Sequence, residues 1–463
     1  MHHRREPELT GRIVVPESPQ YDAARQVFNQ YFNRFPSIIV YAGDTQDVVN
    51  AIRWARCRNI PVRIRSGGHN YEGLSALNNG MVIDVSTMKN IWADPRRGIA
   101  IVQPGVENNE IYHALGEKGM VVPGGVCPTP AIAGVGLGGG HSMLVRAFGL
   151  TLDHLLEVEM VDACGRILYA NDKRNADLFW ALRGGGGGNF GICTAFCFRT
   201  CPIDTVCMAD IGWGLDDMEP VLKAWQALTV PGTDKRLTPI LTIASGTAWT
   251  GEASQTPEEQ PSPINMQAIY LGPLARLREL LQPLLDSGTP QRVMIKELPW
   301  LEAVDRLSAP QPRSPIPFKS TDSFIYGQLP DKAIAIIRSF IDMPPDGSAT
   351  VLFHALGGAV AEVHPRATAY FHRTAWSKVA LWLTWNKPEQ AEQNIRWEEG
   401  LRTALLPYTR GIYVNSPNLA VDDWPRAYYG GNFRDLTCIK ARYDPHNVFH
   451  FPQSIPPARW RNI

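Results

Sequence analysis

Two glycine-rich segments of the sequence each carry one nucleophilic side chain. The first, from Arg65 to Gly73, presents His69, and the second, from Gly124 to Pro130, presents Cys127. Because glycine has no Cβ, the backbone of such segments can approach a large flat ligand closely. An imidazole and a thiol displayed in this way suit covalent capture of an electrophilic cofactor. The pair therefore predicts two protein anchors for a flavin.

A third glycine-rich segment follows the second. Gly134, Gly136 and Gly139 have the spacing of a dinucleotide-binding fingerprint, which requires a strand before it and a helix after it. Pro128 and Pro130 come before it, and proline is excluded from a central strand. We therefore favour an extended glycine ribbon whose backbone N–H groups could bind a pyrophosphate. Glycines that serve only tight turns are the alternative.

The elements expected around the first segment form a strand–helix–strand unit. Residues 37–42 are typical of a buried strand, and the helix after it is capped by Thr45. Residues 61–65 form the next strand, so His69 follows its carboxyl end, where open α/β sheets bind ligands. Further elements are expected at 82–85 (strand), 99–102 (strand), 108–118 (helix), 155–170 (hairpin) and 176–182 (helix).

The sequence changes in character after Pro202. The alternation of strand-like and helix-like segments predicts an α+β fold, with a second domain in which helices back an antiparallel sheet. A surface loop is expected at 250–263, which is rich in Thr, Glu, Gln and Pro. The expected strands lie near 240–244, 268–271, 323–326, 350–354 and 379–385, and the expected helices near 272–284 and 330–342.

The balance of charged residues bears on which kinds of partner the protein could bind. Lys plus Arg and Asp plus Glu both number 45 in the 463 residues, so the formal net charge is zero. This balance predicts neither a nucleic-acid nor an anionic-membrane partner. The sequence has no apolar run long enough to span a membrane and no secretory signal at its start. We therefore expect a cytoplasmic protein, with a spore-surface location or a non-standard route of secretion as alternatives.

The cysteines do not predict a metal site. Cys193 and Cys197 fall on a strand expected at 190–199. Residues four apart on a strand are ~13 Å from each other, whereas a Zn–S bond is ~2.3 Å long. These cysteines are therefore expected to be core thiols.

Several motifs of the sequence are shared with one known family. They are Arg65–His69, Gly125–Thr129, Asp177–Gly191, and a C-terminal stretch with Tyr428–Asn432, Lys440, Tyr443–Pro445 and Gln453–Pro456. Together they resemble the berberine-bridge-enzyme-like FAD-linked oxidases, which have the vanillyl-alcohol-oxidase fold with a PCMH-type FAD-binding domain. The resemblance covers nearly the whole chain and is least specific in its middle.

The resemblance implies a bicovalently bound FAD. In that family the histidine of the first segment bonds the flavin 8α-methyl carbon and the cysteine of the second bonds C6. Those positions are His69 and Cys127 here. The implied domains are an FAD-binding part at 1–205, a substrate-binding domain at 206–412, and a segment at 413–463 that returns to the FAD-binding part. The other cofactor-binding positions expected are Arg65, Ser66, Gly67, Gly68, Asn70, Gly124, Gly125, Val126, Thr129, Gly134, Gly136, Gly139, Asn189, Gly191, Ile192, Tyr429 and Asn432.

The catalytic candidates are tyrosines. The family often places a tyrosine of the C-terminal motif over the flavin, which makes Tyr429 the first choice as base and the adjacent Tyr428 its competitor. Tyr71 resembles a substrate-side tyrosine of the sugar-oxidising members. A glutamate base is doubtful, because the strand at 379–385 carries Trp382 and Thr384 instead of a carboxylate.

The activity implied is that of an FAD-dependent oxidase. Such an enzyme would remove hydride from a C–OH or C–N donor and pass the electrons to oxygen, which yields hydrogen peroxide. An oligosaccharide or a secondary-metabolite alcohol is the expected small-molecule substrate. The alternatives are a flavin dehydrogenase with another electron acceptor, and a flavin-carrying coat or structural protein with little turnover.

Overall fold

A small, mainly parallel sheet forms the N-terminal part of the molecule. The computed structural model describes residues 7–246 and 262–458. The first elements are β1 (Arg12–Val14), α1 (Tyr21–Ala24), β2 (Ile38–Tyr41), α2 (Thr45–Cys57), β3 (Val62–Arg65) and β4 (Met81–Asp84). The strand order is β1-β2-β4-β3, in which β4 runs parallel to β2 and β3. The predicted strand–helix–strand unit is confirmed, but Asp44 caps α2, because Thr45 is already helical and Asp44 accepts a hydrogen bond from the Asp47 N–H.

A five-stranded antiparallel sheet follows. Its strand order is β5-β6-β10-β8-β9, and residues of α3, α4 and α6 share one hydrophobic core with it. The elements are β5 (Ile91–Asp94), β6 (Ile99–Val102), α3 (Asn108–Gly116), β7 (Met120–Val121), α4 (Ile132–Gly138), α5 (Val145–Phe148), β8 (Leu155–Val161), β9 (Ile167–Ala170), α6 (Ala176–Leu182), β10 (Ile192–Arg199) and β11 (Cys201–Pro202). The strands, helices and hairpin expected in this region are present.

The expectation of an extended ribbon through Gly134 and Gly136 is wrong. These residues lie in the helix α4, which begins after Ala131 in extended conformation and ends at Gly138. Glycine disfavours a helix by about 1 kcal/mol per residue. Burial of Ile132 and Leu137 against the core offsets that cost, because tertiary packing supplies most helical stability in proteins.

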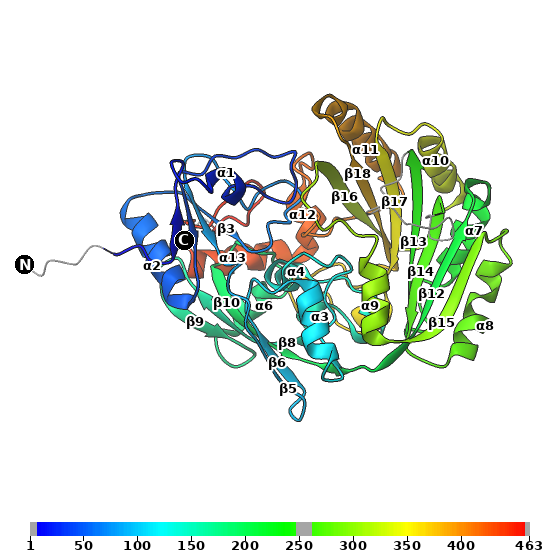
Figure 1. Cartoon of the computed structure of the whole chain (residues 1–463), viewed down its shortest axis with the longest axis horizontal. Coiled ribbons are helices and arrows are strands. Elements are labelled where there is room, and N and C mark those ends of the chain that lie inside the picture. Colours follow the sequence, from blue (N-terminus) through cyan, green and yellow to red (C-terminus); the bar gives the residue numbers. More distant parts are fainter. Residues whose placement is uncertain (1–6, 247–261, 459–463) are drawn as a thin grey trace, which may run out of the picture.

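A seven-stranded antiparallel sheet dominates the second lobe, with the order β15-β12-β14-β13-β17-β18-β16 (Figure 1). Helices α7, α8, α10 and α11 pack on one of its faces. The predicted α+β fold, with an antiparallel sheet backed by helices, is confirmed. The elements are β12 (Thr205–Trp213), α7 (Met218–Ala227), β13 (Leu237–Gly246), β14 (Ile264–Tyr270), α8 (Leu274–Leu285), β15 (Arg292–Pro299), α9 (Trp300–Ser308), β16 (Phe318–Ile325), α10 (Asp331–Ile341), β17 (Ser348–Ala355), β18 (Ser377–Thr384) and α11 (Ala391–Leu405).

The C-terminal segment packs against the first lobe. Its helices are α12 (Trp424–Tyr429) and α13 (Phe433–Tyr443), and α13 contacts α6. Figure 1 shows α13 among the elements of the first lobe and α12 between the two lobes. The domain boundaries at 205/206 and 412/413 stay predictions. Most of the surface loop expected at 250–263 lies outside the described residues, as do residues 1–6.

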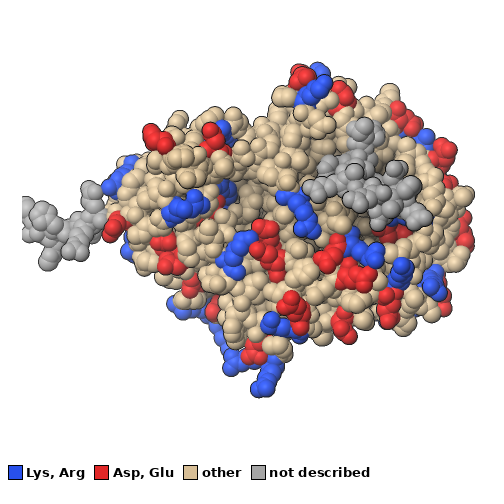
Figure 2. Space-filling model, in the orientation of Figure 1, with Lys and Arg blue, Asp and Glu red and all other residues tan. Residues whose placement is uncertain are grey.

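The surface carries mixed charge. Basic and acidic side chains are interspersed over the face shown in Figure 2, which agrees with the formal net charge of zero. Among the described helices, none has the length and apolar character that a membrane span requires.

Candidate active site

The loop after β3 is held from both sides and leaves its own N–H groups free. Arg65, the last residue of β3, forms a buried ion pair with Asp84, and the Ser66 hydroxyl donates to the Pro104 carbonyl at 2.7 Å. The backbone N–H groups from Gly67 to Asn70 donate to no residue within 7–246 or 262–458. Successive free N–H groups in a turn form a concavity suited to anions.

The Cys127 loop is held by side chains of α3. Asn108 donates from Nδ2 to the Cys127 carbonyl at 2.9 Å, and the Tyr112 hydroxyl donates to the Gly125 carbonyl at 2.8 Å. A Cβ at Gly124 or Gly125 would collide with these same two side chains, which is why glycine is required there. The N–H groups of Gly125 and Cys127 donate to no described residue.

The two loops touch each other. A Cβ built on Gly67 would lie 2.8 Å from the backbone nitrogen of Ala131 and 3.4 Å from the carbonyl oxygen of Thr129. The loops therefore meet backbone to backbone, as the flavin interpretation requires of segments that approach one ligand.

His69 is presented as a neutral ring. It stacks on Phe28, with ring centroids 3.9 Å apart and planes 25° apart. Burial lowers the pKa of His69 to about 4, so the imidazole is uncharged at neutral pH. A neutral imidazole keeps a nitrogen lone pair, which a nucleophile needs.

Cys127 is presented as a thiol. Its sulfur lies 3.5 Å from Gln311 Oε1, and burial raises the pKa of the thiol to about 11 while nearby Lys378 opposes that rise. Because the thiolate is the reactive form of cysteine, covalent bonding at Cys127 depends on a partner that takes its proton.

The seven-stranded sheet contributes a pair of charged side chains to the site. Asp322 on β16 and Lys378 on β18 form a buried ion pair at 3.0 Å. The Tyr413 N–H donates to Asp322 at 2.9 Å, and Lys378 Nζ lies 5.1 Å from the centre of the Tyr413 ring. None of these three residues was expected from the sequence. They come from three separate segments, and no local pattern marks them.

Tyr71 lies near Asp322 and Tyr413. Burial raises the pKa of Tyr71, and the nearby groups of Cys127 and Asp322 add to the rise. Its ring meets Phe318 edge-on at 5.4 Å and Trp382 at 5.7 Å, and those two rings stack at 4.3 Å. Tyr71 therefore joins the anchoring loop to an aromatic wall on the sheet.

Tyr428 and Tyr429 have other partners. The Tyr429 hydroxyl donates to the Gly185 carbonyl at 3.0 Å, and the Tyr428 hydroxyl donates to Gln453 Oε1 at 2.6 Å. Burial raises the pKa of both phenols. These hydrogen bonds hold the C-terminal segment in place, and the catalytic role expected of Tyr429 or Tyr428 stays a prediction.

The expected cofactor residues near the C-terminal segment are also tied to backbone. Asn189 donates to the Gly185 carbonyl at 3.0 Å and accepts from the Ile455 N–H at 2.9 Å. Asn432 donates to the Pro365 carbonyl at 2.8 Å. A Cβ at Gly191 would lie 2.6 Å from the Val161 carbonyl oxygen, and Ile192 pairs with Val161 in the sheet.

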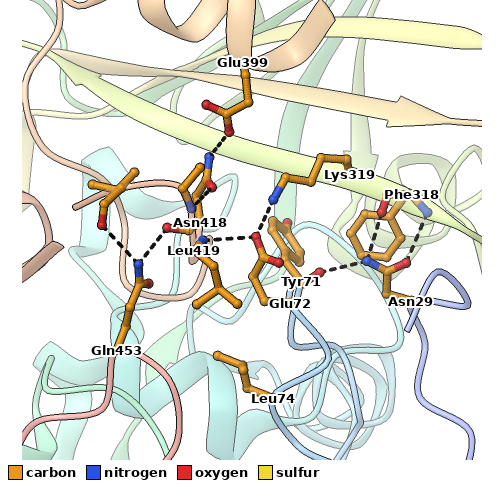
Figure 3. A network of polar contacts seen from close by, with 12 residues as sticks. Asn29, Tyr71, Glu72, Leu74, Phe318, Lys319, Glu399, Asn418, Leu419 and Gln453 are labelled. Atoms are coloured by element: carbon orange, nitrogen blue, oxygen red, sulfur yellow. Dashed lines mark hydrogen bonds and ion pairs between the residues drawn. The ribbon is translucent and has the colours of Figure 1, made fainter. Parts of the chain in front are cut away.

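A buried polar network connects the first anchoring loop with three other segments (Figure 3). Glu72 forms an ion pair with Lys319 of β16 and accepts from the Leu419 N–H at 3.3 Å. Asn418 donates to Glu399 of α11 at 2.6 Å. Gln453 donates to the Asn418 carbonyl at 2.9 Å, so the sheet, α11 and the C-terminal segment all meet at this loop.

Glu398 lies beside this network without a hydrogen-bond partner. Both of its oxygens are buried, and no described residue bonds them. Burial raises the pKa of Glu398 to about 8; neighbouring Lys319 opposes the rise, and Glu399 and Glu72 add to it. The folded protein therefore holds a proton here that the unfolded chain has lost well below neutral pH.

Glu398→Gln is expected to stabilise the protein increasingly as pH rises. A raised carboxyl pKa lowers the free energy of unfolding between the unfolded and folded pKa values, here from about 4 to about 8. Glutamine has the same shape and cannot ionise. The variant should unfold nearly like the parent near pH 5 and exceed it by on the order of 5 kcal/mol near pH 9 in urea titrations. A stability difference that does not vary with pH would contradict the assignment.

The residues present fit a large, flat ligand with an anionic part. Free N–H groups line both loops, and Thr129 Oγ1, Asn108 Oδ1 and His141 Nδ1 are buried without a partner among the described residues. A group with several hydrogen-bond donors and acceptors would satisfy them, as the isoalloxazine and pyrophosphate of FAD can.

Comparison with known proteins agrees with this fit. Residues 36–171 match the family described as FAD binding domain, and residues 412–456 match the family described as berberine and berberine like. The uncharacterized FAD-linked oxidoreductase YgaK of Bacillus subtilis (strain 168) is 41% identical over 98% of this chain and 98% of its own. The chain belongs to the berberine-bridge-enzyme-like family of FAD-linked oxidoreductases. It is therefore an oxidoreductase that uses FAD.

One further sequence relative and two solved structures are similar to this chain. Berberine bridge enzyme-like 12 of Arabidopsis thaliana is 29% identical over 91% of this chain and 84% of its own. The structure of BBE-like 1 of Physcomitrella patens superimposes with a TM-score of 0.87 at 26% identity, and covers 97% of this chain and 98% of that one. A chitooligosaccharide oxidase has the same fold at 23% identity, with a TM-score of 0.84 over 97% of this chain and 98% of its own.

Proposed function

We propose that the protein is an FAD-dependent oxidase with a flavin bonded to both His69 and Cys127. Its substrate would be a small molecule with an oxidisable C–OH (or C–N) group, such as an oligosaccharide or a secondary-metabolite alcohol. Oxygen would take the electrons and form hydrogen peroxide. The observation that supports this most is the meeting of the His69 and Cys127 loops beside Tyr71, Tyr413, Lys378 and Asp322.

Bound FAD would supply a hydride acceptor, and the side chains would handle the proton. Tyr413 is the best placed base, because its oxygen accepts two N–H hydrogen bonds that favour the ionised form. Burial raises the pKa of Tyr413 and these two bonds oppose that rise. Lys378, close to the ring, adds a positive charge. Tyr71 and Trp382 would position the substrate against the sheet. Tyr413 as the proposed base takes the place of Tyr429, which the sequence favoured.

The substrate class can be tested by anaerobic bleaching. The purified yellow protein is mixed without oxygen with chitooligosaccharides, glucose, benzylic and allylic alcohols, and amines. Loss of flavin absorbance with one of these identifies a donor. Admission of air should then restore the colour and release one hydrogen peroxide per flavin. A protein that no compound bleaches would be a flavin carrier with little turnover, against this proposal.

A dehydrogenase is the second candidate. Among proteins of this fold, wild-type Phl p 4.0202 is named a glucose dehydrogenase and a single-residue variant of Phl p 4 is named a glucose oxidase, each at 24% identity to this chain. Oxygen use therefore varies within one fold. If reduced flavin stays bleached in air and is reoxidised by a quinone, the dehydrogenase assignment replaces the oxidase one.

A further inference from the structure

The glycines at 138–140 lie against Tyr413 and Asn415. A Cβ at Gly138 would overlap the carboxamide of Asn415, and a Cβ at Gly139 would lie 2.9 Å from Tyr413 Cε2. Gly140 has a φ of 85°, and a Cβ there would overlap the Thr151 side chain. Larger residues at 138 and 139 would push Asn415 and Tyr413 away, and one at 140 would strain the turn between them. These glycines therefore have a role that needs no bound phosphate.

Two N–H groups converge on the hydroxyl of Tyr413. The Gly140 N–H donates to it at 2.7 Å and Asn415 Nδ2 at 2.9 Å. The Asn415 carboxamide is itself fixed by a bond to the Gly134 carbonyl at 2.9 Å. A phenol oxygen has two acceptor positions and one proton to donate. Both acceptor positions are taken, and the hydroxyl donates to no described residue, so its proton is left for a ligand in the site.

The Tyr413 ring is also held in one orientation. His141 stacks on it, with centroids 4.2 Å apart and planes 21° apart. The His141 ring is held in turn by a hydrogen bond at 2.9 Å between its Nε2 and the Tyr370 hydroxyl. His141 thus covers one face of the ring and Gly139 packs against its Cε2 and hydroxyl edge, so these contacts keep the oxygen at its two donors.

We propose that the segment Gly138–Gly140 and the side chain of Asn415 form a cradle that positions Tyr413 and stabilises its phenolate. Hydrogen bonds to an ionised oxygen are about twice as strong as those to a neutral one, so two donors favour loss of the phenol proton. The proposal rests on the proposed function, in which Tyr413 takes the proton of the substrate O–H while the hydride of the same carbon leaves for the flavin. Asn415 acts through Tyr413 and is therefore a positioning residue.

The first test is the pH profile of flavin reduction. Asn415→Ala and the isosteric Asn415→Asp are compared with the parent in anaerobic single turnovers with the best donor of the bleaching panel. We expect the acid limb of the rate to move up by about one pH unit in N415A, and further in N415D, because a carboxylate opposes the phenolate. At high pH the rate of flavin reduction in both variants should come close to that of the parent. A rate reduced equally at every pH in a folded N415D protein would overturn the cradle.

The second test does not depend on the reaction. Tyrosine is replaced biosynthetically with a fluorotyrosine, whose phenol ionises at lower pH, and tyrosinate absorbance is titrated. The titration curve of the Tyr413→Phe protein is subtracted from that of the parent, which gives the curve of Tyr413 alone. The same subtraction with the Tyr428→Phe protein gives the curve of a second buried phenol as the matched control. N415D should raise the midpoint of Tyr413 by about one unit or more and leave that of Tyr428 unchanged. An unmoved Tyr413 midpoint would overturn the cradle, whereas a moved midpoint without any turnover would contradict only the proposed function.

Discussion

Tyr413→Phe is expected to slow reduction of the flavin by about 10²- to 10⁴-fold, the usual contribution of a positioned general base. The change removes one oxygen and leaves the ring stacked on His141. Affinity for FAD should change little, whereas the free energy of unfolding should fall by about 1–3 kcal/mol, because the N–H groups of Gly140 and Asn415 lose their acceptor. The measurement is the single-turnover rate of bleaching under nitrogen across a range of pH.

Tyr429→Phe is the matched control for this prediction. Its hydroxyl donates to the Gly185 carbonyl, and loss of that bond should cost about 1 kcal/mol of stability with a rate within a few-fold of the parent. The two variants separate the site indicated by the structure from the one the sequence favoured. A large loss of rate in Y429F together with normal rates in Y413F would return the role of base to the C-terminal motif.

Combined replacement of His69 and Cys127 by alanine is expected to release all flavin when the protein is precipitated with acid. The parent should give a yellow pellet, because the two proposed covalent bonds would survive denaturation. Each single variant should keep one bond and a coloured pellet. Flavin absorbance of the supernatant and the mass of the intact chain measure the outcome. The mass of the parent should exceed that of its sequence by one FAD.

Cys438→Ala tests whether loss of any cysteine, and not of Cys127 in particular, releases the flavin. Cys438 is exposed, so its loss should leave the pellet yellow. A colourless pellet from the parent would show that FAD binds without covalent bonds. The activity proposal would survive that result, because the proton-handling residues do not depend on the anchors.

Much of the architecture was predictable because it depends on short-range patterns. The apolar strand at 37–42, the helix after it and the strand ending at Arg65 place His69 at the edge of a sheet, as the structure shows. The prediction failed where packing overrode local preference. Gly134 and Gly136 are poor helix formers, but the burial of Ile132 and Leu137 keeps them in α4.

The tyrosine that we propose as base could not have been chosen from the sequence. Tyr428 and Tyr429 stand in a conspicuous motif, yet their hydroxyls donate to Gln453 and Gly185. Tyr413 lies in an inconspicuous loop, and its surroundings depend on which segments meet it. Gly140 and Tyr413 are far apart in the sequence, so no local pattern predicts the hydrogen bond between them.

The sequence by itself determined the two glycine-rich loops that carry His69 and Cys127, the alternation of helices and strands, and the family. Glycines, nucleophiles and hydrophobic periods are properties of neighbouring residues, so they can be read along the chain. Only the tertiary structure decided which phenol faces a cation, a carboxylate and two N–H donors. Asp322 and Lys378 become neighbours through the pairing of β16 with β18, and Tyr413 joins them because its loop crosses that sheet edge. Such convergence depends on strand pairing and packing over long separations, which set the electrostatic environment of the site.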